Sequence, residues 1–295
     1  MNGQTDVPAL RWGFVGTGGI ANAMANVVAT TPMAELRAVS SRRRTSADEF
    51  ADRFDVALRF DGWQAMLESD DIDAVYVATP TSVREEISIA AANTGKHVLA
   101  EKPFASSASV KRIIDACRKN DVAFMDGTHF VHHPRHHAIK NGMAELVGNP
   151  WSIASAFQFG LPNRGDIRYN AKLEPMGAIG DAGWYNMRAA LEYLPRDAGP
   201  ASVEAVLWRD EGTGAAISGS GVIQFTDGST TTWNCGFDSG ALVMDLCITG
   251  FEGVVAIDNF LSQDEDGSAR YFYKRGSWGP DVIREDRHVE SGLSG

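Results

Sequence analysis

Short apolar strands that alternate with helical patterns over the first half of the chain constrain its fold most. The sequence predicts strands at 11–15, 35–40, 74–78, 97–100 and 122–126, and helices between them ending at about 30, 54, 69, 94 and 119. Repeated β-α-β units with short links build a parallel sheet that helices cover on both faces. Since 295 residues suit two domains, the second half is expected to fold separately.

The pattern changes after about Asn149. Strand-like segments lie at 151–160, 203–209, 215–225, 229–237, 241–249 and 253–257, with one helix at about 182–193. Tight turns such as Asp227-Gly228 favour antiparallel pairing. We therefore predict a fold of class α/β plus α+β. A doubly wound, Rossmann-type parallel sheet is expected in 1–130, and a second domain built on a large, mostly antiparallel open sheet is expected in 131–295.

Composition excludes several classes of protein. The formal net charge of −11 argues against a nucleic-acid surface, which needs clustered lysine and arginine. Three scattered cysteines favour reduced thiols in a cytoplasm over a disulfide framework or a zinc site. The first ten residues lack the apolar core of a signal peptide, and no apolar run is long enough to cross a bilayer. We expect a cytoplasmic protein with no membrane partner.

A glycine-rich turn follows the first strand. Residues 16–21 read Gly-Thr-Gly-Gly-Ile-Ala, which fits G-x-G-x-x-A between a strand and a helix. The first glycine permits a tight turn, the second lets the backbone approach a pyrophosphate, and the helix N-terminus favours anions. The alternative is a plain glycine-rich turn. In this β-α-β context we predict dinucleotide binding by the first five residues of the motif, Gly16, Thr17, Gly18, Gly19 and Ile20.

The end of the second strand indicates which dinucleotide binds. NAD sites usually place an acidic residue there to bind the ribose hydroxyls. This chain instead has Ser41, Arg42 and Arg43, whose hydroxyl and guanidinium groups suit a 2′-phosphate. The alternative is a solvated helix start. We predict NADP as the cofactor in preference to NAD.

Thr79, Pro80 and Thr81 follow the strand at 74–78 and are therefore expected at the carboxyl edge of the same sheet. A turn there could contact the nicotinamide half of the cofactor. It could also be only a βα turn in which Ser82 caps the next helix, and the two interpretations are compatible.

Glu101, Lys102 and Pro103 end the strand at 97–100. The strand delivers the two charges to the edge of the sheet where ligands bind. Pro103 fixes its own φ and disfavours helix for Lys102, so the lysine is expected to be held in an extended backbone. The alternative is a solvated charge pair. We predict that Lys102 is catalytic and that Glu101 and Lys102 line the cofactor site.

Asp181 and Tyr185 form a further candidate pair, within the run Gly180-Asp-Ala-Gly-Trp-Tyr185. Four residues apart, they would share one face of a helix. An aspartate beside a tyrosine can tune proton transfer to a carbonyl or alcohol oxygen, especially with a lysine from another strand. Alternatively, Asp181 caps a helix and Tyr185 is a core aromatic.

These stretches together resemble the oxidoreductase family that includes glucose-fructose oxidoreductase, inositol dehydrogenase and the dimeric dihydrodiol dehydrogenases. The likeness extends through 16–21, 72–103 and 180–185, and the segment 125–135 resembles the dihydrodiol and NADP-dependent xylose dehydrogenases. The resemblance implies hydride transfer between NADP and a sugar or cyclic diol. It also implies that Lys102 contacts the reacting oxygen and that Tyr185 is the general acid/base, assisted by Asp181.

The resemblance carries further expectations. It implies a homodimer or homotetramer formed through the open face of the second sheet. It implies that no metal binds, although five histidines lie close together in the sequence: His129, His132, His133, His136 and His137. It also places His133 and Arg135 along the cleft or at its entrance. Relatives usually continue into a C-terminal helix, which we do not expect in the polar end of this sequence. Two other functions stay open: an enzyme that keeps and recycles its cofactor, and an NADP-sensing regulator.

Overall fold

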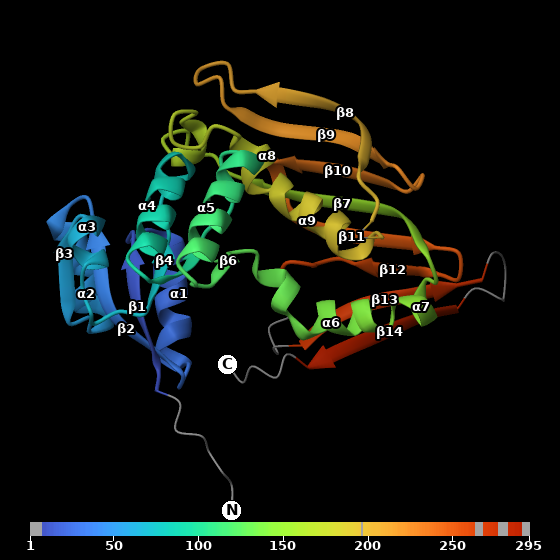
Figure 1. The fold of residues 1–295 in the computed structure, drawn as a ribbon. Helices are drawn as coiled ribbons and strands as arrows, with labels where there is room; N and C mark the ends of the chain where they lie inside the picture. The colour runs from blue at the N-terminus through green and yellow to red at the C-terminus, as the bar shows by residue number, and fades with distance from the viewer. Residues whose placement is uncertain (1–7, 196, 263–267, 277–282, 291–295) are drawn as a thin grey trace, which may run out of the picture. The chain divides into compact units, whose positions relative to one another are not determined.

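The computed structural model describes residues 8–195, 197–262, 268–276 and 283–290. The chain divides into two compact units, residues 1–127 and 128–295. This division lies three residues before the expected boundary after residue 130. Each unit contains its own sheet and its own hydrophobic core (Figure 1).

The first unit is a six-stranded sheet in the order β3-β2-β1-β4-β5-β6, with all neighbours parallel. Its strands are β1 (Leu10–Val15), β2 (Ala34–Ser41), β3 (Leu58–Asp61), β4 (Ala74–Val77), β5 (His97–Ala100) and β6 (Phe124–Asp126). Its helices are α1 (Gly19–Thr30), α2 (Arg44–Phe54), α3 (Trp63–Leu67), α4 (Thr81–Asn93) and α5 (Ser107–Lys119). The predicted doubly wound parallel sheet is confirmed. Strand β3, a four-residue edge strand interrupted by an arginine, was not predicted from the sequence.

Neighbouring residues of β1 show that both faces of this sheet are covered. Phe14 is fully buried in a cluster with residues of α1 and α2, and its ring lies 4.9 Å from that of Tyr76. Gly13 points to the opposite face, where a Cβ would meet Ile72 and Met66 of α3. Strand order reverses between β1 and β4, which is the point at which open α/β sheets bind ligands.

The second unit is an eight-stranded sheet in the order β14-β13-β12-β11-β7-β10-β9-β8. All neighbours are antiparallel except β7 and β10, which run parallel, so the predicted mostly antiparallel sheet is confirmed. The strands are β7 (Pro150–Gly160), β8 (Pro200–Arg209), β9 (Ala216–Phe225), β10 (Thr230–Gly236), β11 (Asp238–Gly250), β12 (Val254–Ile257), β13 (Ser268–Arg275) and β14 (Ile283–Glu290).

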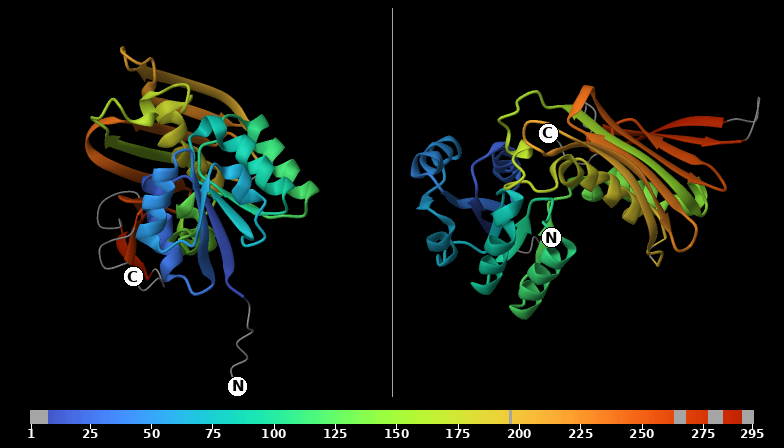
Figure 2. Two further views of the ribbon diagram at one scale, coloured as in Figure 1. Left: turned by 90° about the vertical axis from the view of Figure 1, so that its left-hand side faces the viewer. Right: turned by 90° about the horizontal axis from the view of Figure 1, so that it is seen from above.

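Four α-helices and two 3₁₀ turns complete the described part of this unit: α6 (Pro134–Asn141), α7 (Met143–Leu146), α8 (Gly177–Asp181), α9 (Gly183–Tyr193), η1 (His129–His132) and η2 (Ile167–Tyr169). In Figure 1 and in the right-hand view of Figure 2, α6 and α9 lie against one face of the sheet. The helix expected at 182–193 is confirmed, whereas α6 and α7 were not predicted.

Two C-terminal strands were also missed. Residues 284–289, expected to be a polar end, belong to β14, which pairs along its length with β13. In β13 the residues Ala269, Tyr271 and Tyr273 are buried at every second position, but charged residues flank them and weaken the signal. The sequence also predicted that no helix follows in residues 291–295, which lie outside the described residues.

A buried polar network joins α6 to α9. Glu192 accepts hydrogen bonds from Arg188, at 2.9 Å, and from Lys140. Burial opposes its ionisation, but these two cations outweigh burial and lower the Glu192 pKa to about 2. His136 shares a 2.9 Å hydrogen bond with Tyr193, and burial lowers the His136 pKa to about 4 although Glu192 acts in the opposite sense. Burial of the His136 ring therefore outweighs the attraction of the Glu192 carboxylate.

Candidate functional site

Three loops that the sequence singled out separately are neighbours at the carboxyl edge of the first sheet. They follow β1, β4 and β5, which are adjacent strands. The amide of Ala78 donates to the Val15 carbonyl at 2.9 Å, and the amide of Glu101 donates to the Val77 carbonyl at 3.1 Å. The structure therefore brings the predicted residues of the first unit to one edge.

The turn after β1 has the geometry of a phosphate cradle. Gly16 has φ +112°, and a Cβ there would lie 2.5 Å from the Ala78 carbonyl oxygen, so glycine is required. The Cβ positions of Gly18 and Gly19 face open space, with nothing within 4 Å. Asn22 fixes the turn by donating to the carbonyls of Thr17, at 3.1 Å, and Gly18, at 2.8 Å. The first-turn amides of α1 thus border unfilled space, which suits a bound pyrophosphate.

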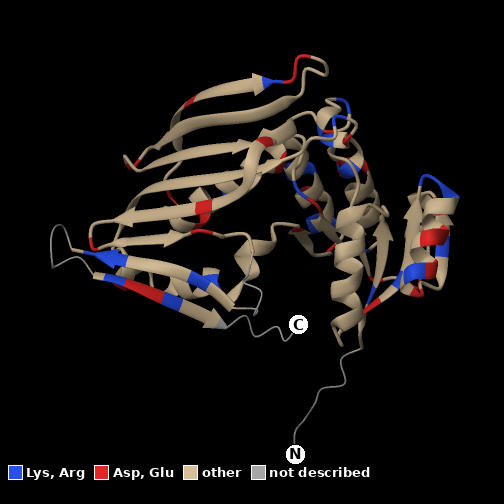
Figure 3. Ribbon diagram, turned by 180° about the vertical axis from the view of Figure 1, so that it is seen from behind, with Lys and Arg blue, Asp and Glu red and all other residues tan. Residues whose placement is uncertain are grey.

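The basic run after β2 divides into two parts. Arg44 begins α2 and forms an ion pair with Asp48 at 3.0 Å. Arg42 and Arg43 are exposed, and neither has an ion-pair partner among the residues that the structure describes. In Figure 3 the loop between β2 and α2 is blue. The hydroxyl of Ser41, the last residue of β2, lies 3.5 Å from the Arg43 amide, so the three predicted residues are close together at the end of this strand.

A buried arginine, which the sequence analysis missed, joins the loops after β4 and β5. Helix α4 begins at Thr81 with Pro80 as its N-cap, so the suggested cap at Ser82 is wrong. Arg84 is 4% exposed, and its guanidinium donates to the Thr79 and Pro103 carbonyls as well as to the Thr81 hydroxyl at 3.1 Å. It fixes one loop against the other.

Glu101 is buried rather than solvated. It is 8% exposed, and its carboxylate accepts from the Tyr76 hydroxyl at 2.7 Å and from the Lys102 amide at 3.2 Å. A Cβ at Gly127 would lie 2.9 Å from the same carboxylate, so the end of β6 also closes around it. The Lys102–Pro103 peptide is cis, and Lys102 itself is half-buried. Glu101 therefore fixes the backbone from which the Lys102 side chain extends.

Asp181 and Tyr185 belong to two successive helices. Asp181 is the last residue of α8, and Ala182 is the N-cap of α9, so the alternative of Asp181 as helix cap is wrong. Asp181 accepts a 2.6 Å hydrogen bond from Arg168 Nε. Burial acts to lower the Arg168 pKa, but Asp181 and Asp166 overcome it and raise that pKa. This ion pair fastens the 166–169 turn to α8.

Tyr185 has a histidine partner that the sequence did not reveal. The tyrosine is 7% exposed, with the Phe157 ring 5.5 Å from its own. Its hydroxyl oxygen lies 3.3 Å from His129 Nδ1, and His129 Nε2 lies 2.9 Å from the Leu261 carbonyl oxygen. Beside them, Trp184 Nε1 donates to the Thr128 hydroxyl at 2.7 Å.

The dense histidine cluster separates into individual roles. His133 is the N-cap of α6 and accepts from the Arg135 amide at 3.0 Å, whereas His136 is buried against Tyr193. The Arg135 guanidinium donates to main-chain carbonyls of residues 259, 262 and 270 at 2.8–3.2 Å. Within the described ranges, no three histidine, cysteine or acidic side chains are grouped as a metal would require, and no helix is long and apolar enough to cross a membrane.

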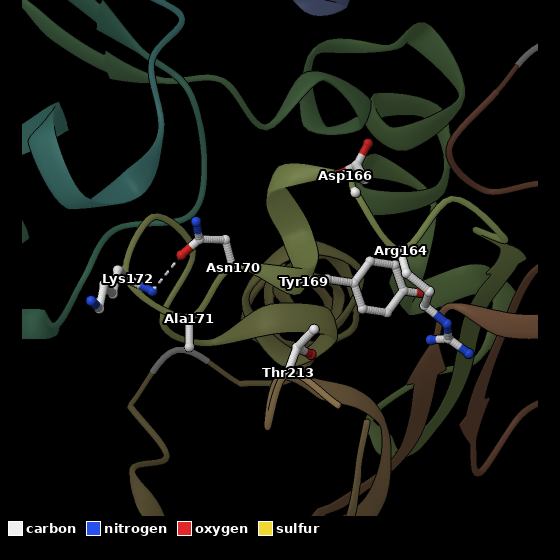
Figure 4. Close-up of a pocket in the computed structure, with 8 residues that line it drawn as sticks. Arg164, Asp166, Tyr169, Asn170, Ala171, Lys172 and Thr213 are labelled. Carbon is white, nitrogen blue, oxygen red and sulfur yellow. Dashed lines mark hydrogen bonds between the residues drawn. The ribbon is translucent and has the colours of Figure 1, made fainter. Parts of the chain in front are cut away.

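An open pocket of about 560 Å³ lies in the second unit, along the loop that Arg168 fastens to α8 (Figure 4). Six of the eight residues that line it are polar or charged, namely Arg164, Asp166, Tyr169, Asn170, Lys172 and Thr213, and the other two are Gly165 and Ala171. In Figure 4 the side chain of Arg164 extends beside the Tyr169 ring, 4.7 Å from its centre. None of these residues was predicted as a site residue, because no local sequence pattern marks a loop whose pocket forms only in the folded unit.

Comparison with known proteins agrees with this geometry. Residues 10–128 match the model of an oxidoreductase family with an NAD-binding Rossmann fold. The dTDP-3,4-didehydro-2,6-dideoxy-alpha-D-glucose 3-reductase of Actinomadura kijaniata is 32% identical over 81% of this chain and 71% of that protein. The D-xylose 1-dehydrogenase (NADP(+)) 2 of Haloferax volcanii is 29% identical over 78% and 70%, respectively.

A solved structure shows the same fold. The crystal structure of a 3-ketoreductase from Actinomadura kijaniata in complex with NADP and TDP-benzene has a TM-score of 0.87 and 28% sequence identity, covering 96% of this chain and 85% of that one. The resemblance drawn from the sequence motifs is thereby confirmed. The chain belongs to the oxidoreductase family with an NAD-binding Rossmann fold, alongside reductases and dehydrogenases of sugars.

Proposed function

We propose that this protein is an NADP-dependent oxidoreductase that interconverts a hydroxyl and a keto group on a sugar or related cyclic alcohol. The observation that carries the proposal is the meeting of three loops at one sheet edge, which combines an open cradle at Gly16–Gly19 with the fixed backbone of Lys102. When bound there, the nicotinamide supplies or accepts a hydride. The relatives named above, which reduce or oxidise sugars, support this reaction class.

The residues of the first unit suit the cofactor part by part. The α1 N-terminus would hold the pyrophosphate, where amides and the helix dipole favour anions. Ser41 and the exposed Arg42 and Arg43 would hold the 2′-phosphate. Thr79, Pro80 and Thr81, fixed by Arg84, would face the nicotinamide half. NADP in the related ketoreductase structure supports this preference.

Lys102 and Tyr185 would handle the reacting oxygen. Lys102 would bind and polarise it with its ammonium group, and Tyr185 would give or take the proton. Within the second unit, the contact with His129 holds the Tyr185 hydroxyl, and the bond from Trp184 to Thr128 fixes the neighbouring residue.

Asp181 would act through position rather than by direct contact with substrate. Its bond to Arg168 holds the loop that lines the 560 Å³ pocket. The polar lining of that pocket, which includes Asn170, Lys172 and Thr213, suits a substrate with several hydroxyl or charged groups. We propose that this loop selects the substrate.

A homo-oligomer remains part of the proposal. Every residue of β8 is exposed, including Val203, Val206 and Trp208, which are each more than half exposed. Apolar side chains on an uncovered edge strand and its sheet favour association with a second copy. Sedimentation analysis of the purified protein would measure the state, and a monomer at micromolar concentration would contradict this part.

The experiment that tests the reaction is a substrate panel read at the reduced-nicotinamide absorbance. Keto sugars, aldoses, inositols and trans-diols would be tested with NADP(H) and NAD(H). On the best substrate, Lys102→Met and Tyr185→Phe should each lower kcat by about 100-fold or more. Lys111→Met, which removes an exposed lysine paired with Asp115, is the control and should change nothing. Unchanged turnover in both site variants would refute the assignment.

A further inference from the structure

The Tyr185–His129 contact in the second unit has the form of a proton-transfer pair. We propose that His129 is the proton partner of Tyr185: its Nδ1 takes the phenolic proton when the substrate is oxidised and returns it when the substrate is reduced. The inference rests on the proposed function and deepens it, because it assigns a chemical role to His129, a residue to which the proposed reaction assigns none. Three observations carry it.

The first is the tautomer of the imidazole. His129 Nε2 lies 2.9 Å from the Leu261 carbonyl oxygen, which can only accept a hydrogen bond, so Nε2 carries the proton. In the neutral ring Nδ1 is then an acceptor, and the Tyr185 hydroxyl 3.3 Å away donates to it. The distance is at the long end of the hydrogen-bond range. The Leu261 carbonyl thus holds the ring ready to receive a proton.

The second observation is the difference in exposure between the two groups. Tyr185 is 7% exposed, whereas His129 is an exposed residue. A buried phenol that accepts a substrate proton on every turnover must pass a proton onward. Among the described residues, Tyr185 is the ionisable group that lies within hydrogen-bond distance of the His129 ring, and no carboxylate is paired with that ring. The histidine is therefore placed between the buried hydroxyl and water.

The third observation is that the fold does not need the His129–Tyr185 bond to hold these segments together. The Trp184–Thr128 bond, at 2.7 Å, already joins the same two segments one residue away. Phe157 and Phe130 pack on the Tyr185 ring, at 5.5 and 6.3 Å between centres. A purely structural role for His129 is thus redundant.

During oxidation the substrate carbon gives up its hydride to the oxidised nicotinamide, and the substrate O–H bond breaks as its proton moves to Tyr185 Oη. The original phenolic O–H bond breaks at the same time, and that proton forms an N–H bond at His129 Nδ1. The products are the ketone, reduced nicotinamide, neutral tyrosine and an imidazolium that loses its extra proton to water. Reduction is the reverse.

The first test reads the pair without any turnover. In protein labelled with ¹⁵N-histidine, the His129 signals should show a protonated Nε2 and an unprotonated, hydrogen-bonded Nδ1 near neutral pH. Tyr185→Phe should shift the Nδ1 resonance of His129 and leave that of His132, an exposed neighbour, unchanged. A proton found on Nδ1 in the wild-type protein would overturn the proposal. This result is independent of whether the proposed reaction is correct.

The second test separates proton transfer from positioning. His129→Asn keeps an acceptor near Nδ1 but cannot exchange protons, and His129→Gln keeps a donor near Leu261. Both should lower kcat for oxidation by about 10- to 100-fold with little change in KM, and both should remove the acidic limb of the kcat/KM profile. His132→Asn is the matched control and should resemble wild type.

The outcomes of the kinetic test are distinct. Full activity or an unchanged acidic limb in His129→Asn would overturn the proton role of His129, while Lys102→Met and Tyr185→Phe would still test the proposed function. If no panel substrate is turned over, the proposed function fails, and the ¹⁵N spectra still decide whether the pair exists.

Discussion

Arg84→Met should affect both the stability of the first unit and the rate of the reaction. The guanidinium donates to the carbonyls of Thr79 and Pro103, and methionine fills a similar volume without donors. A buried acceptor left without its donor costs about 1–3 kcal/mol, so two give about 2–6 kcal/mol. Removing the buried charge recovers part of its desolvation cost. We therefore expect a loss of about 3 kcal/mol, which corresponds to roughly 10 °C in the Tm of a unit of this size.

The same change should loosen the loop from which Lys102 leaves. A displacement of about 1 Å in a reacting group can cost up to about 100-fold in rate, so kcat should fall by about 10- to 100-fold. Arg84→Lys keeps the charge but not the planar fork, and should lie between wild type and Arg84→Met. Arg112→Met, which breaks an exposed ion pair with Glu85, is the control and should leave Tm and kcat unchanged. The assays are thermal melting by circular dichroism and steady-state kinetics; an Arg84→Met protein with wild-type Tm and kcat would refute the reasoning.

Three further changes should each separate one effect from another. Gly16→Ala should lower both Tm and NADP affinity, because its Cβ would lie 2.5 Å from a carbonyl oxygen. The Cβ of Gly18→Ala would lie in open space, so this change should weaken only NADP binding, by about tenfold or more in fluorescence titrations. Arg42→Gln with Arg43→Gln should weaken NADP but not NAD, and equal losses would contradict the 2′-phosphate role. The His136 pKa is about 4 in the folded protein against 6.5 ordinarily, so its stability contribution is complete above about pH 6.5 and is lost as pH falls toward 4. His136→Gln should flatten the fall of Tm in that window, and an unchanged slope would show that another group is responsible.

The first unit was predictable because its signals are local. Gly95 illustrates this: it directly follows the helix predicted to end at about residue 94, and it has φ +76°. Its amide bonds to the Ala92 carbonyl, and the amide of Lys96 bonds to the Ala91 carbonyl, both at 3.0 Å, which is the pattern of a Schellman cap. Because glycine adopts this backbone conformation more readily than other residues, a single residue is enough to predict the helix end without knowledge of distant contacts.

The partners of the site residues were not predictable, because they depend on contacts between distant parts of the chain. Arg84 reaches Pro103, 19 residues away, and Tyr185 meets His129, 56 residues away. The patterns indicated which residues carry chemistry, but not what fixes them. An arginine on a helix facing the sheet is a weak signal, since long side chains often lie along such faces with their charge in solvent.

The histidine cluster shows that some of this information was present in the sequence. Pro134 directly follows His133, and proline favours the first position of a helix, which makes the preceding residue the N-cap. The cap position commits His133 Nδ1 to the Arg135 amide, and the helix that starts there turns His136 toward the buried Tyr193. A local rule thus removes His133 from any shared site, whereas His136 is removed by a contact with a residue 57 positions away. His129 precedes this helix and is free to take a partner from elsewhere in the fold, and that partner is the tyrosine singled out for catalysis.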